Sequence, residues 1–69
     1  MKAGDVFKSR TNERVGIRIE SYVGSKQWRI QSIDFIEGRP TRTYIFEQAS
    51  AFKIKKFYQP HKEKHEDEL

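Results

Sequence analysis

Apolar and polar side chains alternate with a period of two along much of the chain. In residues 14–23, four aliphatic side chains, Val15, Ile17, Ile19 and Val23, fall on one side of an extended backbone, while charged and polar side chains fall on the other. Such alternation is typical of a strand with one buried face. We therefore predict a strand here, with these four side chains directed inward.

Two turns that contain glycine divide the centre of the chain into three strands. The first turn, residues 23–26, contains Gly24, and the second, residues 37–40, contains Gly38. Glycine adopts the positive φ angles that tight turns require. The chain segments around these turns, residues 14–23, 27–36 and 41–47, are therefore predicted to form an antiparallel meander.

The strand predicted at residues 27–36 changes its phase part of the way along. Trp28 and Ile30 share one phase, whereas Ile33 and Phe35 occupy the opposite one. An extra residue in a strand shifts the alternation in this way. We predict a β-bulge or a sharp bend near Gln31–Ser32.

The two ends of this meander are extended by shorter elements. Residues 5–8 are predicted to form a brief first strand, and residues 48–51 a single helical turn. Alternation resumes at residues 52–57, which predicts a last strand with Phe52 and Ile54 inward and Lys53 and Lys55 outward. Phe46 and Phe52 are expected in the core on either side of the helical turn.

These elements predict an all-β fold, a small five-stranded antiparallel barrel with one short helical turn before the last strand. A barrel is favoured because closure protects the edges of a small sheet. The barrel is expected to span residues 1–59. Residues 60–69 are rich in His, Lys, Glu and Asp and are predicted to form a disordered, net acidic tail.

The order of elements resembles that of the SH3-like small barrels, the superfamily of Tudor, KOW and small chromatin-protein domains. The resemblance rests on the short first strand at residues 4–7, the turns at Gly24 and Gly38, and the helical turn at residues 48–51. It implies a basic three-stranded face with an exposed tryptophan that binds DNA, and residues 26–30 are locally similar to that pattern. The chain departs from it in its acidic tail and in the lack of a C-terminal helix. The OB fold is the alternative barrel.

Composition argues against catalysis and against a membrane protein. The 69 residues include no cysteine, the four glycines are isolated, and both histidines lie at the C-terminal end. We therefore predict no enzyme activity, no cofactor and no membrane span, and a cytoplasmic location. His61 and His65 are four residues apart, a spacing that would place two metal ligands on one side of a helix. We interpret this spacing as coincidental in a solvated tail.

Charge is distributed unevenly between the two parts of the chain. Residues 1–60 carry twelve Lys or Arg and six Asp or Glu, a net charge of +6, whereas residues 61–69 carry two Lys and four Asp or Glu, which is −2. A basic domain favours a polyanionic partner, because cations that neutralise phosphates release counterions.

The predicted outward positions combine basic and aromatic side chains. The candidate nucleic-acid-binding residues are Arg14, Arg18, Tyr22, Trp28, Arg29, Lys53 and Lys55. Such a surface suits backbone contacts together with base stacking. Trp28 is either a core residue or a stacking residue at the barrel rim. We predict a small, non-enzymatic module that binds DNA or RNA.

Three alternatives remain. The basic face could be merely solvated, with Glu20 and Asp34 paired to Arg18 and Arg29. The chain could be a protein-binding adaptor or inhibitor of the phage or mobile-element type, anchored by aromatic side chains, namely Trp28, Tyr22 and Tyr58. It could also be an oligomeric subunit. A single barrel does not evidently bury a second set of apolar strand positions, Ile33, Phe35 and Ile45.

Overall fold

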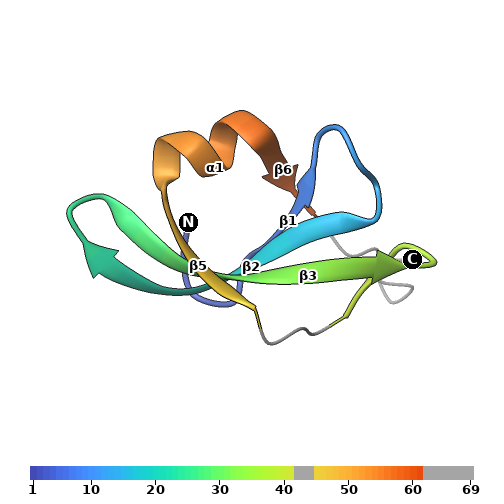
Figure 1. The fold of residues 1–69 in the computed structure, drawn as a ribbon, viewed down its shortest axis with the longest axis horizontal. Helices are drawn as coiled ribbons and strands as arrows, with labels where there is room; N and C mark the ends of the chain where they lie inside the picture. The colour runs from blue at the N-terminus through green and yellow to red at the C-terminus, as the bar shows by residue number, and fades with distance from the viewer. Residues whose placement is uncertain (42–44, 62–69) are drawn as a thin grey trace, which may run out of the picture.

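Short strands and one short helix make up the computed structural model, which describes residues 1–41 and 45–61 (Figure 1). In chain order the elements are β1 (Val6–Ser9), β2 (Val15–Gly24), β3 (Gln27–Ile36), β4 (Arg39–Pro40), β5 (Phe46–Ser50), α1 (Ala51–Phe57) and β6 (Tyr58–Pro60). The turns between β2 and β3 and between β3 and β4 contain Gly24 and Gly38, both with positive φ. Both turns were predicted from their glycines.

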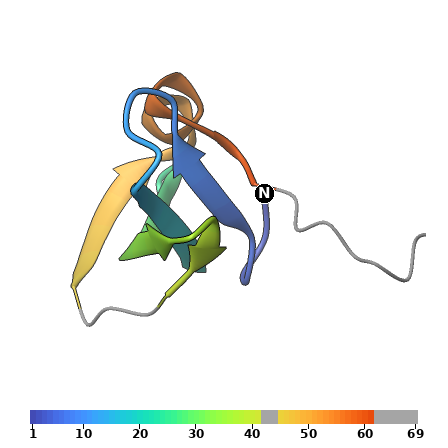
Figure 2. The same cartoon turned by 90° about the vertical axis from the view of Figure 1, so that its right-hand side faces the viewer.

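All strands belong to one antiparallel sheet with the order β4-β3-β2-β1-β6. β5 pairs with the first half of β3, and β4 pairs with its end, so these two short strands together fill one position beside β3. The sheet therefore has five positions, and it curls into a half-barrel. Figure 2 shows β5 and β1 on its two sides, with α1 over the opening between them. The predicted class, a small five-stranded all-β SH3-like barrel, is confirmed, whereas its helical segment and last strand lie farther along the chain than predicted.

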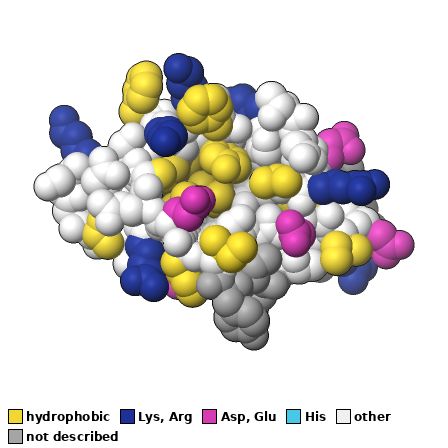
Figure 3. Space-filling view, in the orientation of Figure 1, with side chains coloured by type: hydrophobic (Ala, Val, Ile, Leu, Met, Phe, Trp, Pro, Cys, Tyr) yellow, Lys and Arg dark blue, Asp and Glu magenta, His cyan; other side chains and the backbone are white. Residues whose placement is uncertain are grey.

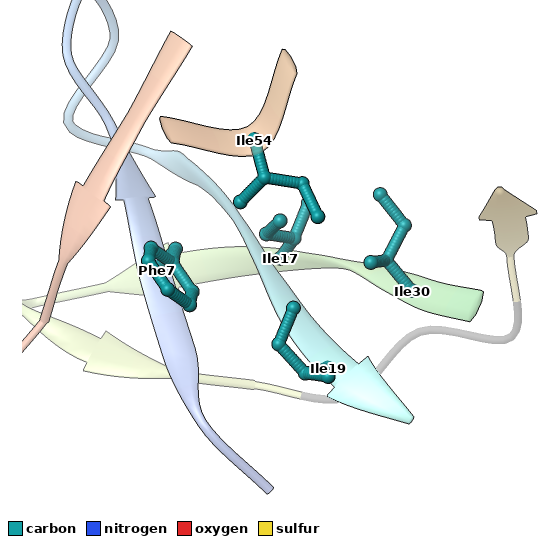
Figure 4. Packing of buried hydrophobic residues seen from close by; sticks show 5 residues of the cluster. All are labelled: Phe7, Ile17, Ile19, Ile30 and Ile54. Atoms are coloured by element: carbon teal, nitrogen blue, oxygen red, sulfur yellow. The ribbon is translucent and has the colours of Figure 1, made fainter. Parts of the chain in front are cut away.

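The core lies on the concave face of this sheet. Phe7, Ile17, Ile19, Ile30 and Ile54 are buried there and project into one common space (Figure 4). β1, β2 and β3 contribute the buried side chains of the sheet, and α1 contributes Ile54 from the other side. The predicted inward positions Ile17, Ile19, Trp28 and Ile30 are confirmed, Val15 is half-buried, and Val23 is an exception.

That exception, Val23, follows from bulges in β2. The register between β2 and β3 shifts between Ile19 and Ser21 and again between Tyr22 and Gly24, so β2 holds the extra residues. Val23 lies at the second shift and is 48% exposed. The prediction that Val23 points inward is wrong, and so is the predicted bulge at Gln31–Ser32.

The change of phase in β3 has a different cause, which is burial on both faces. Ile30 faces the concave core, whereas Ile33 and Phe35 are buried on the opposite face, farther along the strand. There the chain folds back through β4, and both the backbone N–H and the hydroxyl of Thr41 donate to the Asp34 carbonyl at 2.8 Å. One chain thus buries both Ile33 and Phe35, whereas Ile45, the third residue of the oligomer hypothesis, is 61% exposed.

The segment predicted as the last strand is helical. Residues 51–57 form α1, and the predicted helical turn at residues 48–51 is mostly strand β5. The Ser50 side chain caps the helix by accepting a hydrogen bond from Lys53 N at 3.1 Å. Residues 51–58 also place an apolar side chain at positions 51, 54 and 58, a spacing that a helix can use. The period-two pattern of residues 52–55 fitted a strand equally well.

Two predicted core residues lie at the surface instead. Phe52 is 77% exposed, because only Ile54 of α1 faces the core, and Phe46 is also exposed. Phe46 lies opposite Gln31 in the register of β5 with β3, on the face away from the core. The prediction that both phenylalanines are buried is wrong.

β6 ends the described part of the chain. Tyr58–Pro60 pairs with β1, and His61 N donates to the Val6 carbonyl at 2.9 Å. Regular pairing therefore continues into the first residues of the segment predicted as a tail. Residues 62–69, the rest of that segment, lie outside the described residues.

Candidate functional site

The structure divides the predicted basic face between two sides of the sheet. Ile19 and Ile30 are paired neighbours that face the core, so Arg18 and Arg29, each one position away, face outward on the convex side. Lys53 and Lys55 belong to α1, which covers the concave side. The expected surface of four cations on neighbouring strands is therefore not formed.

The convex arginines have partners other than carboxylates. Arg18 donates from Nη1 to Gln31 Oε1 at 3.4 Å, and the Arg29 guanidinium carbon lies 4.7 Å from the centre of the Phe46 ring. Within residues 1–41 and 45–61, neither arginine is paired with Glu20 or Asp34, contrary to the solvated-face alternative.

Arg14 lies apart from both groups. It is exposed just before β2, and its carbonyl accepts a hydrogen bond from Phe35 N at 2.8 Å. This bond ties the start of β2 to the far end of β3, away from α1.

Tyr22 and Trp28 form an aromatic pair beside the β2–β3 turn. Their ring centres are 5.0 Å apart in an edge-to-face arrangement. Trp28 is half-buried against the core, whereas Tyr22 is 55% exposed and its hydroxyl accepts from Lys26 N at 3.0 Å. Trp28 is thus chiefly a packing residue, and Tyr22 is the exposed ring of the pair.

A groove of about 160 Å³ lies between β5 and α1. Its lining residues are Ile30, Glu47, Gln48, Ala49, Lys53, Ile54, Phe57 and Tyr58. Apolar side chains predominate in it, and Lys53 and Glu47 are the two charged residues. We call this hollow the β5–α1 groove. Figure 3 shows apolar side chains from the helix region down into the centre of this face, with basic side chains beside them at the top.

The helical turn distributes the α1 side chains around the groove. Successive residues are rotated by about 100°, so with Ile54 in the core, Lys53 and Phe57 lie on one flank and Lys55 on the other. The residues that line the two hollows agree with this rotation. Lys53 and Phe57 line the β5–α1 groove, whereas Lys55 lines a second hollow of about 580 Å³ beside β1 and β6. Phe52 projects away from Ile54, at the outer surface of the helix.

The second hollow is larger but differs in character. Its residues are Met1, Asp5, Val6, Phe7, Arg10, Lys55, Tyr58, Pro60 and His61. Arg10 donates from Nη2 to the Lys55 carbonyl at 3.2 Å, so part of its hydrogen-bonding capacity is used to hold α1. Its aromatic rings are the buried Phe7 and the half-buried Tyr58 and His61, whereas the β5–α1 groove has Phe57, which is 50% exposed.

Tyr58 lines both hollows, and the charge of Glu47 affects its pKa. Burial of the phenol, and secondly the negative charge of Glu47, raise the pKa of Tyr58 above its ordinary value of 10.0. The phenol is therefore neutral at physiological pH and can donate a hydrogen bond from the wall of the groove.

This shift leads to a prediction for alkaline stability. The folded protein holds the Tyr58 proton more tightly than the unfolded chain does, so the stabilisation is complete below pH 10 and is lost as the pH rises through the raised pKa. Urea unfolding at several pH values above 10 is expected to show a smaller fall in stability for Tyr58→Phe than for the unchanged protein. Equal losses in both proteins would show that Tyr58 is not the group responsible.

The described residues contain neither a metal-ligand cluster nor a membrane-spanning helix. In residues 1–41 and 45–61, no three His, Cys, Asp or Glu side chains are grouped to hold a metal ion. The His61 ring packs edge-to-face on Phe35 with ring centres 4.9 Å apart, and His65 lies outside these residues. In the same part of the chain, no helix is both long and apolar enough to cross a membrane.

Comparison with known proteins does not identify a family for the chain. No family model matches the chain, and neither does any curated protein or solved structure. Function is therefore inferred from the side chains themselves.

Lys53 is the one groove residue among the predicted nucleic-acid-binding residues, and the charged Glu47 and the exposed Phe57 were missed. Both were assigned to strands, and the orientation of Phe57 depends on the helix that begins after Ser50. Ser50 followed by an apolar residue at position 54 is a helix-start pattern that could have revealed this orientation.

Proposed function

We propose that this protein is a small, non-enzymatic nucleic-acid-binding module and that the β5–α1 groove is its binding site. The main support for this proposal is that the Lys53 ammonium and the exposed aromatic ring of Phe57 lie on the same flank of α1. A cation beside an exposed aromatic ring provides a phosphate contact and a stacking surface together.

The charge around the groove supports a polyanionic ligand. α1 carries Lys53, Lys55 and Lys56 and no carboxylate. Lys26 lies next to its first turn, because the Lys26 carbonyl accepts from Ala51 N at 3.4 Å. Residues 1–60 have a net charge of +6, which attracts nucleic acid over a longer range.

A protein-binding adaptor is the second candidate, and the free edge of β5 favours it. Among the described residues β5 pairs only with β3, so its other edge borders the groove without a strand partner. An extended peptide can add to such an edge. This candidate gains support if nucleic acid of every kind fails to bind.

Two charge reversals on the same helix test the proposed site. Lys53→Glu is expected to weaken binding of a labelled oligonucleotide about tenfold, the effect of losing one charge-assisted contact. It should also flatten the slope of log K against log salt by about 0.7 on a single strand or 0.9 on a duplex. Fluorescence anisotropy at several salt concentrations measures both quantities.

Lys55→Glu is the matched control. It changes the net charge by the same amount, but Lys55 lies on the opposite flank of α1, in the second hollow. We expect it to reduce affinity less than Lys53→Glu does. A larger effect of Lys55→Glu would place the site in the second hollow and contradict the proposal.

A further inference from the structure

We propose that the ligand of the β5–α1 groove is single-stranded nucleic acid, and that an unpaired base enters the groove while its phosphate remains at the rim. This inference rests on the proposed function and specifies its ligand class. Three features of the groove support it: the position of Glu47, the orientation of Phe57 and the limited size of the hollow.

Glu47 determines which part of a nucleotide can enter. Its carboxylate is on the concave side, directly opposite Ile30 in the register of β5 with β3, and its charge raises the pKa of Tyr58 in the same groove. A phosphate inside the groove would be repelled by this charge. The amino group of a base would instead donate a hydrogen bond to the carboxylate.

Phe57 offers the surface on which that base can stack. Half of the side chain is exposed, and it lines the groove together with Tyr58. A ring can stack on the face of a base only where neighbouring bases do not cover that face. Single strands satisfy this condition, and stacking on aromatic side chains is the usual way in which they are held.

Lys53 completes the arrangement at the rim. It lies one helical turn before Phe57 on the same flank of α1, so a phosphate at the ammonium leaves the attached base free to enter beside the ring. A hollow of about 160 Å³ has an apolar floor, Ile30 and Ile54, and its volume suits a single base rather than paired strands.

The competing mode is insertion of α1 into the major groove of a duplex. The outer surface of the helix would then meet the base pairs, and Phe52, which is 77% exposed there, would make the apolar contact. Phe57 would lie outside that interface. The two modes therefore assign opposite roles to two phenylalanines of the same helix.

The test compares Phe57→Leu with Phe52→Leu, each titrated with a labelled single strand and with the duplex of the same sequence. Leucine preserves apolar contacts but removes the aromatic face, and equal circular dichroism spectra and melting temperatures show that each variant is folded. We expect the single strand to bind more tightly than the duplex, and Phe57→Leu to weaken single-strand binding about fivefold or more. Phe52→Leu should change it less than twofold.

The outcomes separate this inference from the proposed function. Tighter binding of the duplex, or a larger effect of Phe52→Leu, would overturn the single-strand inference while leaving nucleic-acid binding in place. If the unchanged protein binds neither oligonucleotide, both the inference and the proposed function fail.

Discussion

Replacing Gly16 with alanine is expected to lower the folding stability of the protein more than any other substitution considered. A Cβ atom at this position would overlap both the Phe35 ring and the Phe7 carbonyl oxygen. The ring could shift, but the carbonyl belongs to β1, whose residues pair with β2 on one side and β6 on the other. Overpacking against backbone costs about 3 kcal/mol or more, a large share of the stability of a small domain.

Urea unfolding followed by circular dichroism measures this loss. Ser21→Ala is the matched control, because Ser21 is exposed on the same strand and its replacement should change stability by less than about 0.5 kcal/mol. An unchanged urea midpoint for Gly16→Ala would mean that β1, β2 and the end of β3 do not approach one another as closely as described.

Ile54→Ala is expected to cause the second-largest loss of folding stability. Ile54 is the only buried residue of α1 and lies in one cluster with Phe7, Ile17, Ile19 and Ile30. Truncating a buried isoleucine to alanine costs about 2–5 kcal/mol. Because this contact also holds α1 over the open side of the half-barrel, the groove should be lost together with the stability.

The control for this variant lies next to it on the helix. Lys53→Ala removes an exposed side chain and should change stability by less than about 0.5 kcal/mol. Thermal melts of both variants distinguish the two effects. Equal melting temperatures for Ile54→Ala and Lys53→Ala would show that α1 is not anchored through its isoleucine.

The fold class was predictable because most strands have one buried face. Ile17 and Ile19 alternate with polar residues and lie on the same face of the strand, so period two identified β2 directly. β3 was harder to interpret, because its two ends bury opposite faces and imitate a bulge. The real bulges are in β2, where the side-chain pattern did not reveal them.

The site was less predictable because it depends on α1. Residues 52–55 alternate like a strand, and only the cap at Ser50 and the burial of Ile54 distinguish a helix. The change from strand to helix turns Lys55 away from Lys53 and brings Phe57 into the groove. The candidate cations were thus chosen from sequence. Their separation between the convex side of the sheet, the start of β2 and the two flanks of α1 was not predicted.

Chemical-shift mapping shows directly which residues of the protein contact the nucleic acid. Backbone amide resonances of the isotope-labelled protein are recorded while a short single-stranded oligonucleotide is added at low salt. We expect the largest shifts around the β5–α1 groove, at Glu47, Ala49, Lys53, Phe57 and Tyr58. Shifts centred on Arg18 and Arg29 on the convex side, or no shifts at all, would contradict the proposed site.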